Sequence, residues 1–417
     1  MMREDGIQTA SAEQGVGSPD LGLSPERGEL ALPVLTMDEA AFDANVEAMF
    51  DYVAKAGVSI APHAKTPMSP ELSRRLLDRG AWGLSVANLQ QARVFLENGA
   101  RRLLVANQIG GRRSAERFAA LLQRFPDAVL VFFADSPESL ETVDHVGCTA
   151  GRTVPVLVEV GAGRAGARSL DAACAVIEAA SRLSHVELAG VAAYEGAAAT
   201  ADPQETVKAI SALNALAGEV HALLRSAAPD RPLILSAGGS SFFDLVVGDL
   251  KPLASRDGNT ELVLRSGAIF FHDHGVYERS LGAMDARGGF AAVTGVAARD
   301  AFRPALTVWA EVLSRPEPGL AICGMGMRDV SYDQDLPVPL AAWRDGVQTA
   351  NRDALGKVVK LNDQHAFLRL PEGSDLGVGD IVAFGISHPC TCLDRWRVIL
   401  GRGADGRIAA AYPTHFS

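Results

Sequence analysis

The segment Val154-Pro-Val-Leu-Val-Glu-Val160 decides the fold class of this chain. It is apolar at almost every position, so a strand formed by it would be buried on both faces. Pro232-Leu-Ile-Leu-Ser236 has the same character. Strands buried on both faces are typical of parallel sheets covered by helices, whereas a strand with one solvated face alternates between apolar and polar residues.

Outward from these two strands, apolar runs alternate with amphipathic segments. The predicted strands cover 58–65, 82–87, 102–107, 128–134, 154–160, 186–194, 232–236 and 261–271. The predicted helices cover 38–56, 69–79, 89–98, 112–124, 136–145, 168–183, 203–226 and a short segment near 240–248. Eight strands with helices between them predict an α/β protein with a (β/α)8 barrel of the TIM type.

The two ends of the chain differ from this alternating region. Residues 1–27 are polar and rich in Gly, Ser and Glu, which predicts a flexible N-terminal tail. We therefore expect the barrel over 28–275, with 28–37 as a candidate strand of a second domain. Beyond 275 the chain has short apolar runs separated by Gly, Pro and Asp, without a long helical pattern. This predicts a mostly β domain over 276–417.

Composition narrows the classes of partner and compartment. The 417 residues carry a formal net charge of −11 and no long basic run, which argues against nucleic acid and anionic membranes as partners. We expect no apolar stretch long enough to span a bilayer, and the first residues lack the apolar core of a secretory signal. Five scattered cysteines are typical of reduced thiols. Together these features predict a cytoplasmic protein.

Lys65 ends the first predicted strand, in Val58-Ser-Ile-Ala-Pro-His-Ala-Lys65-Thr66. The chain has only six lysines, and no other one follows a predicted strand in this way. A lysine at the end of a buried strand either finds a partner or loses hydration, and desolvation favours the neutral amine that attacks carbonyl groups. Lys65 is therefore a candidate nucleophile toward a carbonyl cofactor; the alternative is a lysine that forms a salt bridge at the strand end.

Other candidate residues also follow predicted strands, and the active site of such a barrel forms at these strand ends. They are His63 near the first strand end, Arg164 after the fifth strand, Tyr194 at the end of the sixth, Gly238, Gly239 and Ser240 after the seventh, and Ser266, Gly267 and Ala268 at the end of the eighth. The last two loops offer backbone N–H groups and hydroxyls for a phosphate. A phosphate site opposite a strand-end lysine fits pyridoxal 5'-phosphate.

Each of the remaining candidates has a structural alternative. His63 shares a face with Lys65 and either flanks it or is a hydrogen-bonded barrel histidine. Arg164 either meets the phenolic oxygen of the cofactor or pairs with a carboxylate on the barrel rim. Tyr194 either contacts the cofactor ring or caps the core.

The segment Gly385-Ile-Ser-His388-Pro-Cys390-Thr-Cys392 contains a candidate metal site. His388 and Cys390 are two residues apart after an extended run, a spacing that places both side chains on the same side. Imidazole and thiolate suit Zn²⁺, with Mn²⁺ as an alternative, and only two protein ligands would leave positions open, as in catalytic sites. The alternative is a strand-end histidine beside a buried cysteine. The spacing of Cys392 does not exclude it as a ligand.

Two histidines and a tyrosine follow the last predicted strand, in Phe271-His-Asp-His-Gly-Val-Tyr277. His272 and His274 have the spacing of a metal pair, but they also fit the linker between the domains. Tyr277 is expected to approach the site from the second domain.

Four of these motifs, taken in chain order, resemble those of one enzyme family. Pro62-His-Ala-Lys65-Thr66, Ala193-Tyr194-Glu-Gly196, Gly238-Gly239-Ser240 and His388-Pro-Cys390 are similar to motifs of the D-threonine aldolase and D-serine dehydratase family. The family has the alanine-racemase fold (fold type III) and binds pyridoxal phosphate. The resemblance covers about residues 30 to 415.

The resemblance implies a role for each motif. Lys65 would be the Schiff-base lysine, 238–240 and 266–268 would hold the phosphate, and a metal would lie at His388 and Cys390 in a homodimer. His365 lies in a stretch similar to the family's Glu-His stretch before the metal motif, which implies a supporting role. Many members continue the lysine motif with His and Lys, where this chain has Pro67 and Met68, so the subfamily stays open.

From the resemblance we expect a pyridoxal-phosphate- and metal-dependent lyase acting on small β-hydroxy D-amino acids, with Lys65, His63, Tyr194 and Arg164 in catalytic positions. The first expectation is β-elimination of water, which would convert D-serine or D-threonine to a 2-oxo acid and ammonia. The alternatives are a D-threonine-type aldolase, a hydroxyaspartate-specific dehydratase or aldolase, and a non-catalytic protein that binds pyridoxal phosphate.

Overall fold

The computed structural model describes residues 20–416 and contains an eight-stranded parallel sheet that forms a barrel. Its strands are β2 (Ser59–Ile60), β3 (Leu84–Val86), β4 (Arg102–Val105), β5 (Val129–Ala134), β6 (Val154–Val160), β7 (Val186–Ala193), β8 (Leu233–Ala237) and β9 (Thr260–Leu264). They pair in the order β2-β9-β8-β7-β6-β5-β4-β3. The central strands are buried on both faces, as their unbroken apolar runs predict.

The sheet curls until its two outer strands meet. Just beyond β2, His63 forms a parallel bridge with Ser85 of β3. The Ser85 N–H donates to the Pro62 carbonyl at 2.9 Å, and the Ala64 N–H donates to the Ser85 carbonyl at 2.9 Å. The predicted fold class is confirmed. β2 is shorter than the predicted 58–65, because the chain leaves the strand at Pro62 and turns.

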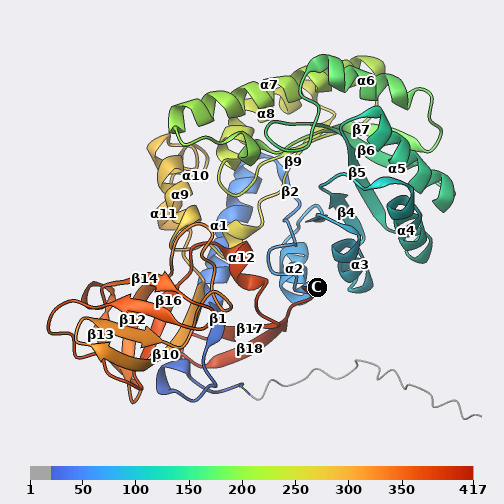
Figure 1. The fold of residues 1–417 in the computed structure, drawn as a ribbon. Helices are drawn as coiled ribbons and strands as arrows, with labels where there is room; N and C mark the ends of the chain where they lie inside the picture. Colours follow the sequence, from blue (N-terminus) through green and yellow to red (C-terminus); the bar gives the residue numbers. More distant parts are fainter. Residues whose placement is uncertain (1–19, 417) are drawn as a thin grey trace, which may run out of the picture.

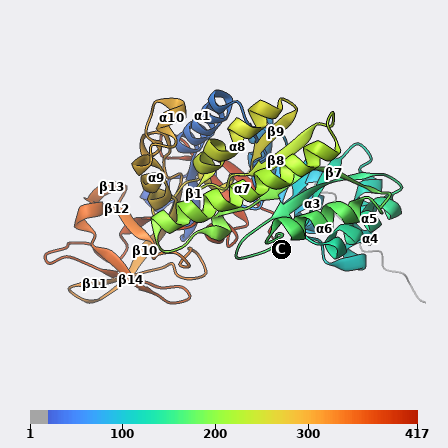
Figure 2. The ribbon, with the colours of Figure 1, turned by 90° about the horizontal axis from the view of Figure 1, so that it is seen from above.

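Eight helices cover the outside of the sheet (Figure 1, Figure 2). They are α1 (Glu39–Ala56), α2 (Pro70–Asp78), α3 (Leu89–Glu97), α4 (Gly111–Arg124), α5 (Pro137–Ala150), α6 (Leu170–Ala180), α7 (Pro203–Ala227) and α8 (Phe243–Asp257). Several begin at a side chain that accepts a backbone N–H of the first turn, among them Asp38, Asn88 and Asp202. α8 is much longer than the segment predicted near 240–248.

α7 corrects the expectation about spanning segments. Among the described residues it is the one helix whose length and composition would allow it to cross a bilayer, with a hydropathy of 1.2 over its most apolar window. It packs on β7 and α8, and 44% of that window is buried. Ile210, Leu213 and Val220 are among its buried residues, so its apolar character serves the packing of the protein.

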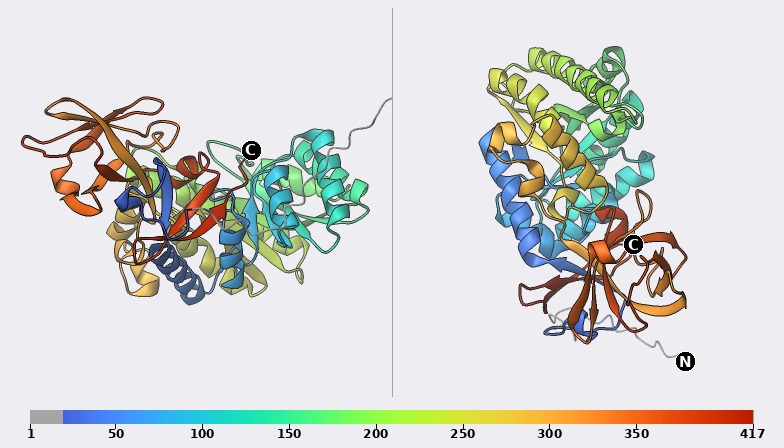
Figure 3. Two further views of the ribbon diagram at one scale, coloured as in Figure 1. Left: turned by 90° about the horizontal axis from the view of Figure 1, so that it is seen from below. Right: turned by 90° about the vertical axis from the view of Figure 1, so that its left-hand side faces the viewer.

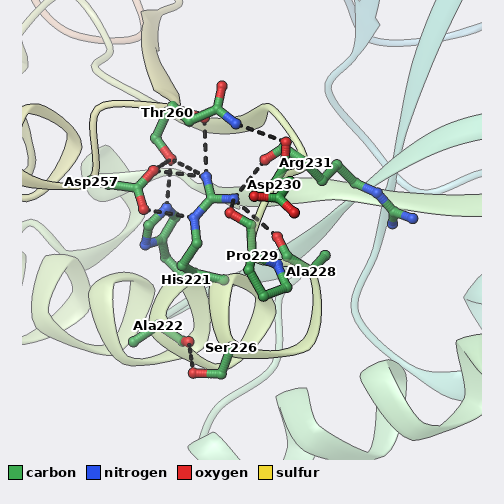
Figure 4. A network of polar contacts seen from close by, with 11 residues as sticks. His221, Ala222, Ser226, Ala228, Pro229, Asp230, Arg231, Asp257 and Thr260 are labelled. Carbon is green, nitrogen blue, oxygen red and sulfur yellow. Dashed lines mark hydrogen bonds and ion pairs between the residues drawn. The ribbon is translucent and has the colours of Figure 1, made fainter.

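The C-terminal end of α7 is bound to β9 by a polar network (Figure 4). Arg225 donates to both oxygens of Asp257 at 2.6 and 2.7 Å, and His221 Nε2 lies 2.8 Å from the Thr260 hydroxyl. The hydrogen bond from Arg225 is the main cause that lowers the pKa of Asp257 to about 2. Thr260 begins β9, so this network lies at the amino-terminal end of the barrel, away from the strand ends that carry the candidate residues.

The second sheet is mostly antiparallel and lies to one side of the barrel (Figure 1, Figure 3). It contains β10 (Leu306–Glu317), β11 (Leu320–Cys323), β12 (Val338–Arg344), β13 (Val347–Asn351), β14 (Lys357–Leu361), β15 (Ala366–Arg369), β16 (Ile381–Gly385), β17 (Val398–Arg402) and β18 (Ile408–Pro413). The early strand β1 (Val34–Asp38) joins it, antiparallel to β10 and parallel to β17. The short helix α12 (Pro389–Leu393) lies between this sheet and the barrel (Figure 1).

Three short helices, which the sequence did not predict, precede strands β10 to β18 of this sheet. They are α9 (Val276–Ala286), α10 (Ala291–Thr294) and α11 (Ala298–Ala301), of which α10 and α11 contact α1 of the barrel. Only Leu281 and Met284 of α9 are buried hydrophobic residues, so its apolar periodicity is weak.

Residues 20–27 are also ordered, contrary to the expected tail. The Gly22 N–H donates to the Ile408 carbonyl, the Ile408 N–H donates to the Leu23 carbonyl, and Leu23 packs on Leu30 and Leu400. Residues 1–19 of the expected tail lie outside the described part of the chain.

Candidate active site

Lys65 lies in the turn between β2 and α2, where its side chain is exposed and borders a cavity at the carboxyl ends of the barrel strands. The expectation that strand burial desolvates this amine was wrong, because β2 ends at Ile60 and the chain has already turned at Lys65. The cavity is also lined by His63, Arg164, Tyr194, Gly239, Asn107 and Arg265. The sequence-predicted residues from strands one, five, six and seven therefore share one space.

His63 is half-buried beside this cavity, and its Nδ1 has no hydrogen-bond partner within the described chain. Burial lowers the pKa of His63 well below its ordinary value, and the positive charges of Lys65, Arg265 and Arg164 lower it further. The imidazole is therefore neutral at physiological pH, with a ring nitrogen available to a ligand.

Arg164 and Tyr194 lie together at the mouth of the cavity. The Arg164 guanidinium is stacked 4.7 Å from the centroid of the Tyr194 ring. Burial raises the pKa of the Tyr194 hydroxyl, and the neighbouring Glu195 carboxylate adds to this effect. Tyr194 is thus a neutral hydrogen-bonding group, and Arg164 supplies a positive charge beside it.

Arg265 also belongs to the site, although it is not among the residues predicted from the sequence. Its side chain is only 6% exposed and lines the cavity. It donates to the Ser236 hydroxyl at 2.8 Å and to the Ala193 carbonyl at 2.6 Å. Arginine is rarely this buried unless it has a partner, so an arginine that directly follows an apolar strand was the available signal. With Lys65 and Arg164, it gives the cavity three cationic side chains.

The loop after β8 differs from the sequence expectation in one respect. The N–H groups of Gly238 and Gly239 donate to the two carboxylate oxygens of Glu195, at 3.1 and 2.5 Å. Glu195 is fully buried. These two N–H groups are therefore engaged within the protein, whereas the sequence predicted them as phosphate donors.

Other donors of the two loops remain available to an anion. The backbone N–H groups of Ser240, Gly267 and Ala268 have no acceptor within the described chain. The loops are packed closely: the Ser266 hydroxyl donates to the Gly238 carbonyl at 2.9 Å. A Cβ at Gly267 would lie 2.5 Å from the His63 carbonyl oxygen. Glycine is required there, and it allows the two loops to meet beside the Lys65 turn.

The metal-motif residues lie at the start of α12. His388 is the N-cap residue, with φ −159° and ψ 108°, and Cys390 belongs to the first helical turn. The extended spacing assumed from the sequence was therefore wrong, although the two side chains still interact. The Cys390 Sγ lies 3.3 Å from the Thr66 hydroxyl, next to Lys65 in the chain. This contact joins α12 of the second domain to the Lys65 turn of the barrel.

His388 and Cys390 each favour the charged form of the other. Burial opposes protonation of His388, but the hydrogen bond and charge of Cys390, followed by those of Asp333, raise the pKa of His388 to about 9. Burial also opposes ionisation of Cys390, but His388, Thr66 and Lys65 together lower the pKa of this thiol. The thiolate form that binds metals is thus favoured.

A metal ion at this pair would need further ligands. Among residues 20–416 no group of three or more His, Cys, Asp or Glu side chains is arranged to hold a metal. Cys392 is fully buried, and burial raises the pKa of its thiol to about 12. The donor set of one imidazole and one favoured thiolate fits Zn²⁺ with positions open to water or substrate.

Of the other candidate residues, three histidines lie away from the cavity and one tyrosine reaches the site. His272 is buried with Nε2 3.3 Å from Glu278, and the ring of His274 packs against Gly385, so both serve the junction between barrel and sheet. His365 is exposed in the turn between β14 and β15. Tyr277 lies on α9 and reaches the site: its hydroxyl hydrogen-bonds with Ser240, and its ring centroid is 6.4 Å from that of His388.

Comparison with known proteins identifies the family. The alanine racemase N-terminal domain model matches residues 37–243, and the putative serine dehydratase domain model matches 305–401. A D-threonine aldolase of an Arthrobacter species is 28% identical over 352 residues, which cover 83% of this chain and 82% of the relative.

Solved structures agree with this match. The D-threonine aldolase of Filomicrobium marinum has a TM-score of 0.72 and 25% identity, covering 93% of this chain and 95% of that one. The D-threo-3-hydroxyaspartate dehydratase of Delftia sp. HT23 has the same fold, with a TM-score of 0.70, 20% identity and coverage of 94% and 99%. The chain therefore belongs to the D-threonine aldolase and D-serine dehydratase-like family of pyridoxal-phosphate-dependent lyases, which have the alanine-racemase fold.

Proposed function

We propose that this enzyme removes water from β-hydroxy D-amino acids and that it uses a divalent metal held by His388 and Cys390. One observation carries the proposal: the hydrogen bond between Thr66 and Cys390 holds the histidine–cysteine pair against the turn of Lys65. A lysine that binds a carbonyl cofactor and a pair that binds a metal therefore face the same substrate.

The residues around the cavity fit pyridoxal phosphate. Lys65 is exposed toward the cavity and would hold the cofactor covalently. The free N–H groups of Ser240, Gly267 and Ala268 would bind its phosphate, because these loops contain donors without an internal acceptor. When bound, the cofactor withdraws electrons from the α-carbon of the substrate, and the metal polarises the β-hydroxyl.

The protein's own groups then move the proton and orient the substrate. The Lys65 amine, once released from the cofactor, accepts the proton from the α-carbon. His63 is neutral, so it is able to accept a hydrogen bond beside this amine. Arg164 and Tyr194 lie at the cavity mouth, where they would contact the polar edge of the cofactor.

The pair His388 and Cys390 favours Zn²⁺, with Mn²⁺ as the alternative, because a thiolate is a soft ligand. The coordination positions of the metal that the protein leaves open would accept the carboxylate and the β-hydroxyl of the substrate. Support for dehydration comes from the match of residues 305–401, which contain His388 and Cys390, to the putative serine dehydratase domain model.

A second candidate is cleavage of the Cα–Cβ bond, which would release glycine and an aldehyde. It is favoured by the 28% identity to a D-threonine aldolase. The same residues serve either reaction. Which bond breaks would depend on how the side chains of the site orient the substrate.

Product analysis separates the two candidates. The purified protein is incubated with D-threonine, pyridoxal phosphate and Zn²⁺. We expect 2-oxobutyrate and ammonia, whereas glycine and acetaldehyde would replace the proposal by the aldolase. Formation of neither product from D-threonine, D-serine or 3-hydroxy-D-aspartate would overturn both candidates. Cys390→Ala should lose metal and turnover, and Cys148→Ala, which alters an exposed thiol, is the matched control.

A further inference from the structure

We infer that Asp333 is a positioning residue that fixes the His388 ring and directs its Nε2 atom toward the metal. The inference rests on the proposed metal site. Asp333 belongs to the loop between β11 and β12, 55 positions before His388, and none of the sequence motifs includes it.

The contact between the two residues has a defined geometry. His388 Nδ1 lies 2.7 Å from Asp333 Oδ2. A carboxylate only accepts, so Nδ1 carries the hydrogen and donates it. In the neutral ring this places the lone pair on Nε2. Metal-binding histidines commonly donate their other N–H to a carboxylate in this way, which fixes the tautomer and raises the basicity of the ligand.

Asp333 is itself held from a second direction. The Thr391 hydroxyl donates to Asp333 Oδ1 at 2.6 Å. Thr391 follows Cys390 on α12, so the same short helix carries the histidine, the cysteine and the hydroxyl that orients the carboxylate. Both oxygens of Asp333 are thus used on α12, and rotation of the carboxylate would break one of these bonds.

The loop is bound to the residues on both sides of α12 independently of this carboxylate. The His388 N–H donates to the Ser331 hydroxyl at 3.2 Å, and the Ser387 hydroxyl donates to the Asp335 carbonyl at 2.8 Å. The Trp396 indole N–H donates to the Asp329 carbonyl at 2.9 Å. A substitution at Asp333 should therefore change the orientation of His388 without releasing the loop.

The test measures Zn²⁺ affinity of the full-length protein by competition with a chromophoric chelator. Removing such a carboxylate partner from a metal-binding histidine typically weakens metal affinity by about 10- to 100-fold. We expect a loss in this range for Asp333→Ala, a smaller loss for Asp333→Asn, and the smallest loss for Thr391→Val. The matched control is Asp335→Asn, which alters a carboxylate of the same loop that pairs with Arg279. Its affinity should equal that of the wild type.

Each outcome has one meaning. Unchanged affinity in Asp333→Ala, with a folded protein by circular dichroism, would overturn the inference. In a second experiment Co²⁺ replaces Zn²⁺, and the visible absorption bands of the Co²⁺-loaded Asp333→Asn variant are compared with those of the wild type. Bands at the same positions support a positioning role, whereas shifted bands would make Asp333 a ligand. If the wild type binds no Zn²⁺, the proposed metal site itself is refuted. If the wild type binds Zn²⁺ and Asp333→Ala binds it equally well, only the role of Asp333 is refuted.

Discussion

Substitution of Glu195 tests how the loop after β8 is held. Its fully buried carboxylate accepts the N–H groups of Gly238 and Gly239. Glu195→Ala would leave two N–H groups without an acceptor, and each such group costs about 1–3 kcal/mol. We therefore expect the free energy of unfolding to fall by about 2–6 kcal/mol, from two groups at this cost. Glu195→Gln keeps one acceptor, so its loss should be about 1–3 kcal/mol.

The assay combines urea denaturation with titration by pyridoxal phosphate. The affinity for the cofactor should fall with stability, because the Ser240 N–H follows directly after the two glycines that Glu195 holds. The matched control is Glu187→Gln, an exposed glutamate that pairs with Arg231. Exposed pairs contribute about 0–1 kcal/mol, so this variant should differ little from the wild type.

Tighter cofactor binding in Glu195→Ala, with unchanged stability, would refute this reasoning. It would mean that Gly238 and Gly239 donate to the phosphate, as the sequence predicted, and that Glu195 competes with the ligand for them.

Three further predictions concern other parts of the site. Lys65→Ala should fail to retain the visible absorbance of the cofactor through dialysis; retention would place the attachment elsewhere. Burial raises the pKa of the Asp273 carboxyl from its ordinary value of 3.8 to about 7 in the folded protein. The contribution of this carboxyl to the free energy of unfolding is therefore complete below the pKa of 3.8 that it has in the unfolded chain, and it is lost as pH rises through 7. Asp273→Asn should flatten the dependence of Tm on pH across this window, and an unchanged slope contradicts the assignment. Gly385→Ala would place a Cβ 2.3 Å from the His274 ring, so the Tm of this variant should fall by several degrees. Gly373→Ala is the comparison: it introduces a Cβ at a positive φ but into open space, so it measures backbone strain without crowding.

The sequence alone determined the class of the fold and most of the residues that line the cavity. Apolar runs such as Val154–Val160 require burial on both faces, and this requirement implies parallel strands with helices outside. The order of strands and helices then places Lys65, Arg164, Tyr194 and Gly239 at the same end of the barrel. These deductions depend on periodicity and on chain order, which are local properties.

The tertiary structure alone decided how these groups are charged and held. Lys65 is exposed because Pro62 ends its strand early. Glu195 takes the N–H groups predicted for a phosphate, and Asp333 reaches His388 from a loop 55 residues away. Hydrogen-bond partners and desolvation depend on side chains that packing brings together from distant segments. No local pattern encodes those contacts, so the hydrogen-bond partners and the charge states of the site residues emerged only with the fold.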